Sequence, residues 1–128
     1  MQRKIFISYS RQDAAAVQQL ADALTEGGHQ VFLDQQLSGG QSWWNTLLDR
    51  IQTCDAFVPV VSTNYLESVP CKEEARYAGA LGRPFVPVNI EEVSPALVDP
   101  RVAEAHWVAF RPSDTQSLLS LMRAFTVM

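Results

Sequence analysis

Apolar residues along the chain follow two different spacings. Short apolar runs of strand length alternate with longer segments in which apolar residues recur at the spacing of one helix face. The strands predicted from the short runs are residues 4–9, 30–33, 55–61, 85–90 and 107–110. The helices predicted from the longer segments are residues 13–24, 43–53, about 70–82 and 117–125.

Residues that commonly begin and end helices stand at several of these boundaries. Ser10 and Asp13 have the spacing of a capping pair at the start of the first helix. Gly27 and Gly28 are predicted to end that helix. Pro70 suits the first turn of the third helix, which Gly82 is predicted to close.

Strands and helices that alternate with short connections favour a mostly parallel five-stranded sheet with helices on both faces. The chain has 128 residues, of which 47% are hydrophobic, and this size fits one domain with a proper core. In such a sheet ligands bind beyond the carboxyl ends of the strands. We therefore expect function in the segments that follow each strand.

Charge and composition exclude several classes of function. The net charge is -4 and no run of Lys or Arg exceeds two residues, so a nucleic-acid surface is not expected. Apolar stretches such as residues 56–61 fall far short of the roughly 20 residues of a membrane helix. Cys54 and Cys71 are too few for a disulfide framework or a cysteine metal site. A cytoplasmic protein is expected.

The strand ends lack the phosphate-binding motifs of related architectures. No Gly-x-Gly-x-x-Gly and no Gly-x4-Gly-Lys-Ser/Thr occurs, which disfavours a Rossmann dinucleotide fold and a P-loop. A phosphoacceptor receiver domain would have acidic residues after the first strand and an aspartate after the third. Residues 8–10 (SYS) and 62–64 (STN) stand at those places instead.

An ordered set of short blocks covers nearly the whole chain. The blocks are FISYS at 6–10, GHQVFLD at 28–34, GQSW at 40–43, STNYL at 62–66, CKEE at 71–74 and HWV at 106–108. In order and spacing they resemble bacterial-type Toll/interleukin-1 receptor (TIR) domains. The resemblance implies a flavodoxin-like three-layer α/β sandwich formed by a single domain, residues 1–128. Such domains are usually attached to a sensor or oligomerising partner, which leaves open whether the chain is a fragment.

The resemblance also implies a site and a reaction. Catalytic members cleave NAD+ between nicotinamide and ribose with one glutamate early in the third helix, and the matching residue is Glu74. The other positions that line this cleft are Tyr9, Ser10, Arg11, Asp34 and Trp43. NAD+ is then the substrate, and neither a metal nor a resident cofactor is expected. The chain has Pro70 where the family often has tryptophan.

Each candidate residue also has an ordinary structural explanation. Glu74 is then a solvated acid in a first helical turn, where acids are common. Trp43 and Trp44 point about 100° apart on a helix, so one is expected to be exposed, and we favour Trp43. Tyr9 is then a turn tyrosine, Arg11 a solvated arginine and Asp34 a helix or turn acid.

The loop of residues 34–42, from Asp34 to Ser42, has a second role in the family. Neighbouring domains contact each other through it in ordered arrays, so the resemblance implies homotypic assembly. Gly39 and Gly40 would let the loop change shape. The alternative function is therefore a non-catalytic scaffold that only recruits other TIR domains, with Glu74 inert.

Overall fold

The chain folds as a parallel sheet with helices on both faces. The structure is a computed structural model that describes residues 2–33 and 41–126, the side chains of residues 41–43 excepted. The sheet has five strands in the order β2-β1-β3-β4-β5, and every pair of neighbours is parallel. The strands are β1 Lys4–Ser8, β2 Gln30–Leu33, β3 Ala56–Val61, β4 Val88–Asn89 and β5 Val108–Ala109. This strand order is that of flavodoxin-like folds, as predicted.

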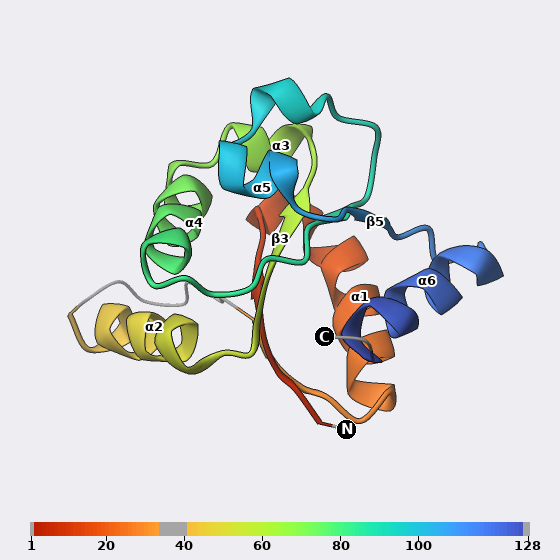
Figure 1. The fold of residues 1–128 in the computed structure, drawn as a ribbon, viewed down its shortest axis with the longest axis horizontal. Coiled ribbons are helices and arrows are strands. Elements are labelled where there is room, and N and C mark those ends of the chain that lie inside the picture. Colours follow the sequence, from red (N-terminus) through yellow and green to blue (C-terminus); the bar gives the residue numbers. More distant parts are fainter. Residues whose placement is uncertain (1, 34–40, 127–128) are drawn as a thin grey trace.

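The helices lie in two layers and at one end of the sheet. They are α1 Ala14–Glu26, α2 Gln41–Thr53, α3 Thr63–Leu66, α4 Val69–Ala80, α5 Pro100–Glu104 and α6 Thr115–Thr126, with 3-10 turns at Arg11–Asp13 and Pro95–Leu97. Figure 1 shows α1 and α6 on one side of the sheet, α2 and α4 on the other, and α3 and α5 at one end.

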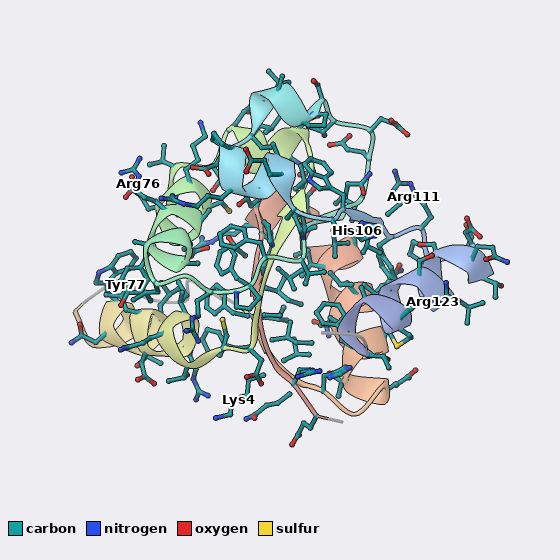
Figure 2. All side chains as sticks on the ribbon, viewed as in Figure 1. Lys4, Arg76, Tyr77, His106, Arg111 and Arg123 are labelled. Carbon is teal, nitrogen blue, oxygen red and sulfur yellow. The ribbon has the colours of Figure 1, made fainter. Side chains whose placement is uncertain are left out.

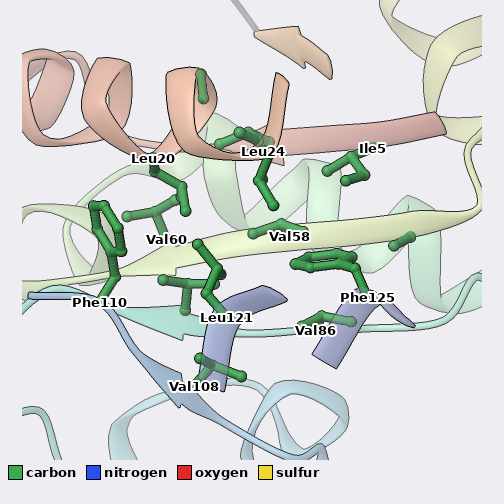
Figure 3. Packing of buried hydrophobic residues seen from close by; sticks show 14 of the residues in the cluster. Ile5, Leu20, Leu24, Val58, Val60, Val86, Val108, Phe110, Leu121 and Phe125 are labelled. Atoms are coloured by element: carbon green, nitrogen blue, oxygen red, sulfur yellow. The ribbon is translucent and has the colours of Figure 1, made fainter. Parts of the chain in front are cut away.

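Side chains of the central strands alternate between two cores. Ile5 and Ile7 of β1 pack with α1 and α6, in the cluster that also contains Val58 of β3 (Figure 3). Phe6 and Phe57 point to the other face and pack against α2 and α4. This alternation follows from the two-residue repeat of a strand, and it decides which strand-end side chains meet α4.

The predicted fourth and fifth strands are shorter in the structure. Residues 85–90 were expected as one strand, but only Val88–Asn89 is a regular strand, beside an isolated bridge between Phe57 and Phe85. Pro59 of β3 interrupts the ladder between these two stretches, because proline has no backbone N–H to donate to the neighbouring strand. The fifth strand is also shorter than predicted, Val108–Ala109 in place of residues 107–110.

Of the two residues predicted to cap the first helix, Ser10 makes a capping hydrogen bond and Asp13 does not. Ser10 does cap, since its Oγ accepts a hydrogen bond from the Gln12 N–H at 3.3 Å, but this opens the 3-10 turn and α1 begins at Ala14. Asp13 makes no side-chain cap bond and instead bonds to residues beyond β3. Gly27 and Gly28 end α1 as expected, with Gly28 at φ +92°.

Candidate functional site

A pocket of about 390 Å³ opens at the carboxyl end of the sheet. Its walls are the segment after β1 and the segment from α3 to the first turn of α4. The lining residues are Tyr9, Ser10, Arg11, Gln12, Asn64, Glu67, Ser68, Pro70 and Cys71. Three of the predicted substrate residues, Tyr9, Ser10 and Arg11, therefore share one pocket.

Asp13 joins the two walls of this pocket. Its carboxylate accepts hydrogen bonds from the Ser62 Oγ at 2.5 Å and from the Asn64 Nδ2 at 2.9 Å. Since β1 and β3 are neighbours in the sheet, the segments that follow them start side by side. The Asp13 bonds then fix Asn64 on the pocket wall. Sequence reasoning missed Asn64, because its position depends on a contact with a residue 51 positions away.

The first turn of α4 forms the rest of the wall. The Ser68 Oγ accepts a hydrogen bond from the Cys71 N–H at 3.3 Å, and Pro70 lies in the first turn as predicted. Pro70 is exposed, whereas Cys71 is buried and faces inward. The α4 end of the pocket is thus a capped first helical turn without an aromatic side chain.

Glu74 lies behind this wall, one turn after Cys71 on the same face of α4. Its side chain is only 2% exposed, and its Oε1 accepts a hydrogen bond from the Ser8 Oγ at 2.6 Å. Ser8 follows Ile7 at the end of β1, so it points to the same face as Phe6, the face that α4 covers. Glu74 itself is not on the surface of the pocket.

The interpretation of Glu74 as a solvated acid in a first helical turn was wrong. Glu74 is the sixth residue of α4 and is buried. The helix dipole acts mainly within the first turn, so the Ser8 hydrogen bond is the better reason for a stable carboxylate there. The exposed acid is its neighbour Glu73, whose carboxylate pairs with Arg76 at 3.2 Å.

Tyr65 belongs to the same buried cluster, and sequence reasoning did not single it out. Its side chain is 4% exposed, and its hydroxyl has no hydrogen-bond partner within residues 2–33 and 41–126. Burial raises the pKa of the Tyr65 hydroxyl, the Cys71 thiol and the Glu74 carboxylate raise it further, and the nearby Ser8 hydroxyl partly offsets this. The Tyr65 hydroxyl therefore keeps its proton.

The remaining predicted site residues cannot be placed. Asp34 lies outside the described residues, as does most of the 34–42 loop, and Trp43 is described only as part of the α2 backbone. The neighbouring Trp44 is 38% exposed.

The two histidines are distant from the pocket. His29 Nδ1 accepts a hydrogen bond from the Arg3 N–H at 3.1 Å, and burial, with nearby positive charge, lowers its pKa. His106 lies beside Trp107 and α6. The described residues contain no group of three or more His, Cys, Asp or Glu able to hold a metal ion. None of the described helices is long and apolar enough to cross a membrane.

The chain is thus an α/β domain with a site beyond the ends of its strands. Its sheet has the parallel order β2-β1-β3-β4-β5, a pocket opens beyond β1 and β3, and a buried glutamate lies on α4. A family model described as TIR domain matches residues 5–122, so the chain belongs to the TIR domain family. A comparison with curated protein sequences gave no match.

Solved structures share this fold at low sequence identity. The TIR domain of the Toll-related receptor TRR-2 from Hydra magnipapillata has a TM-score of 0.75 and 14% identity over 98% of this chain and 96% of that one. The TIR domains of the activated Roq1 resistosome give 0.71 and 20%, with 98% of each chain covered. The CMP N-glycosidase BcmB from Clostridium botulinum gives 0.62 and 15% over the full length of both chains.

Proposed function

We propose that this TIR domain cleaves NAD+ at the bond between nicotinamide and ribose, releasing nicotinamide and linear or cyclic ADP-ribose. The observation that carries the proposal is the Glu74 carboxylate, buried behind the pocket and held by the Ser8 hydroxyl at 2.6 Å. Burying a carboxylate is costly, so such groups are concentrated at functional sites. Glu74 is also the residue that matches the catalytic glutamate of NAD+-cleaving members of the family.

A single carboxylate suffices for this reaction. As the bond between the ribose C1′ and the pyridinium nitrogen breaks, its electron pair moves to the nitrogen and nicotinamide leaves as a neutral molecule. No general acid is needed, unlike in the cleavage of an ordinary glycoside. In hydrolysis, water then adds its oxygen to C1′ and loses a proton, which gives linear ADP-ribose. In cyclisation, a ring nitrogen of the adenine forms the bond to C1′ instead. The task of Glu74 is to stabilise the cationic ribosyl centre or to bind the ribose hydroxyls.

The pocket residues have side chains that suit the rest of the substrate. Arg11 offers the planar set of donors that binds phosphate oxygens, and Tyr9 offers a ring. Domains of the same fold include a CMP N-glycosidase, whose name describes cleavage of a nucleotide N-glycosidic bond. This supports the proposal as chemistry that the fold can host. The proposed reaction uses NAD+ as its substrate and needs no cofactor. The cytoplasmic location stays a prediction.

The buried position of Glu74 requires the site to open before the carboxylate reaches a ribose. We assign this opening to assembly of neighbouring domains through the loop of residues 34–42, the role that the family resemblance implies. The activated Roq1 resistosome is an assembly that contains TIR domains of this fold.

Activity should therefore depend steeply on protein concentration. We expect nicotinamide release per mole of protein to fall when the domain is diluted, because assembly is lost by mass action. Leu37→Asp should lower activity at high concentration, since burial of a leucine in an interface contributes about 1.5 to 3 kcal/mol. Sedimentation of both proteins gives their assembly state. A monomeric Leu37→Asp protein with wild-type specific activity at every concentration would show that one chain has a complete site.

A purely recruiting TIR scaffold remains the second candidate function. The observation that favours it is the α4 end of the pocket, where exposed Pro70 takes the place of the family aromatic and Glu74 does not reach the surface. In this case the same loops act as protein contacts and NAD+ stays intact.

Pro70→Trp tests whether this position contacts the base. The new ring should stack on nicotinamide or adenine, which is worth about 1 kcal/mol for a ring pair, and raise the rate or shift the ratio of cyclic to linear product. Chromatography of the products gives both quantities. Lys72→Trp, at an exposed position of α4 outside the pocket, is the control. If a folded Pro70→Trp protein has the wild-type rate and ratio, Pro70 is not in the base site.

A further inference from the structure

The pocket wall contains an amide side chain whose orientation is fixed by a carboxylate. Asn64 lines the pocket, and its Nδ2 donates a hydrogen bond of 2.9 Å to the Asp13 carboxylate. An ionised carboxylate can only accept, so the atom of the amide that faces Asp13 must be the nitrogen and not the oxygen. Asp13 therefore decides which way the Asn64 amide is turned.

The turn that carries Asn64 is held at two further points. The second oxygen of the Asp13 carboxylate accepts a hydrogen bond from the Ser62 Oγ at 2.5 Å. Glu91, which follows β4, accepts a hydrogen bond from the Thr63 N–H. Carboxylates from the segments after β1 and β4 thus hold one turn of α3 in place, together with the amide that it presents to the pocket.

The oxygen of the Asn64 amide is left for a ligand. Among the residues that the structure describes, the hydrogen bonds of the Asn64 side chain end at Asp13, so Oδ1 has no donor there. Asn64 is only partly buried, so water can reach this atom in the free protein. A fixed acceptor loses little conformational freedom when a ligand binds, which favours affinity. The ligand group that it selects must carry a proton.

We infer that Asn64 is a substrate-binding residue that accepts a hydrogen bond from a hydroxyl or amino group of the substrate, and that Asp13 is its positioning residue. In NAD+ this group is the adenine amine or a ribose hydroxyl, and Arg11 on the other wall suits the phosphates. The inference rests on the proposed function for the identity of the ligand, whereas the fixed amide concerns this chain alone.

Binding of ADP-ribose tests the acceptor without turnover, because this ligand has no nicotinamide to lose. Asn64→Ala should raise the Kd of ADP-ribose about three- to tenfold through the loss of one hydrogen bond. Calorimetric titration of the concentrated domain gives the Kd. Thr63→Ala, at the exposed neighbouring position outside the pocket, should bind like the wild type. Equal Kd values for the two variants, or a wild type that does not bind ADP-ribose, would overturn the inference.

Arg76→Gln controls for unspecific attraction of the phosphates to a surface cation. Arg76 projects from α4 into solvent, with its side chain 69% exposed, and it does not line this pocket (Figure 2). We expect the wild-type Kd from this variant. A loss as large as that of Asn64→Ala would mean that surface charge holds ADP-ribose, which contradicts a fixed acceptor in the pocket.

Nucleotide analogues identify the donor group. IDP has an oxygen in place of the adenine amine of ADP, and 2′-deoxy-ADP and 3′-deoxy-ADP each lack one ribose hydroxyl. If the amine is the donor, the wild type prefers ADP to IDP and Asn64→Ala loses this preference. If a hydroxyl of the adenosine is the donor, the preference over one deoxy analogue is lost instead. If Asn64→Ala weakens ADP-ribose alone, the donor is a hydroxyl of the terminal ribose.

A double-mutant cycle separates the positioning role of Asp13 from a structural one. Asp13→Ala should also weaken ADP-ribose, because the released Asn64 amide no longer holds its oxygen toward the ligand. If Asp13 acts through Asn64, adding Asp13→Ala to Asn64→Ala costs no further affinity. A further loss equal to that of Asp13→Ala alone would refute the positioning role.

An exchange of the two residues tests the orientation of the amide in the free protein. Asn64→Asp sets two carboxylates against each other across the 2.9 Å contact, which should lower Tm at neutral pH by about 4 °C or more. Adding Asp13→Asn restores one donor between the two positions and should recover most of this loss. An unchanged Tm in Asn64→Asp, or no recovery in the exchanged pair, would contradict the bond from Nδ2 to Asp13.

Turnover of NAD+ separates this inference from the proposed function. Asn64→Ala should raise KM for NAD+ more than it lowers kcat, because the hydrogen bond is present both before and during cleavage. Cleavage by Asn64→Ala with the wild-type KM would remove Asn64 from the site and leave the proposed function intact. A wild type that binds ADP-ribose through Asn64 but leaves NAD+ whole would refute the proposed function alone.

Discussion

Glu74→Gln should abolish cleavage of NAD+ while the fold is retained. The substitution removes one charge and almost no volume, and the remaining carbonyl oxygen can still accept the Ser8 hydrogen bond. Loss of an electrostatic group aimed at a developing charge lowers kcat by about 100- to 1000-fold. Nicotinamide release by the concentrated protein measures this effect, and circular dichroism reports the fold.

Glu73→Gln is the matched control for this substitution. Glu73 is next to Glu74 in sequence, but it is exposed and pairs with Arg76. An exposed ion pair contributes little to stability, and Glu73 points away from the cluster. We expect wild-type activity from Glu73→Gln. If Glu74→Gln is as active as Glu73→Gln, the catalytic role of Glu74 is refuted.

Phe57→Ala should cause the largest loss of stability among single changes in the core on the α2 and α4 side. Phe57 is completely buried, and its ring lies 5.5 Å from that of Phe6 and 5.1 Å from that of Phe85. Truncation of a buried phenylalanine costs about 3 to 5 kcal/mol through lost burial and the cavity left behind. Urea unfolding gives the change in free energy.

Phe32→Ala provides the comparison for Phe57. Phe32 also contacts Phe6, at 5.4 Å between ring centroids, but it lies on the edge strand β2 and is only partly buried. Water or the Arg50 side chain, which lies over the ring at 5.2 Å, can fill part of the space it leaves. The loss should be clearly smaller than for Phe57→Ala. Equal losses would contradict the central position assigned to Phe57.

The sheet was predictable because its signal is local. Each strand carries an apolar run bounded by polar residues, and each long helix carries its own repeat of apolar positions. The helices α3 and α5 were missed because they span only Thr63–Leu66 and Pro100–Glu104. A single turn has too few positions to show a period, and both are held by caps from Ser62 and Asp99.

The site was predictable only in part. Tyr9, Ser10 and Arg11 were predicted through the family resemblance, and the structure places them in one pocket beyond β1. Glu74 was singled out through the family resemblance, and its catalytic role stays a prediction. Its burial was not expected, because exposure depends on which residue of α4 faces Ser8. Tyr65 lies in the STNYL block at 62–66, but nothing in the sequence distinguishes it there. Its burial is visible only in the folded arrangement.

The most direct test of the central claim follows NAD+ by proton NMR in a concentrated solution of the wild-type domain. We predict that the signals of bound nicotinamide in NAD+ disappear, while those of free nicotinamide and of linear or cyclic ADP-ribose appear in equal amounts. The same sample prepared with Glu74→Gln should keep its NAD+. NAD+ that stays intact with the concentrated, assembled wild-type domain would contradict the account and favour a TIR domain that acts only as a scaffold.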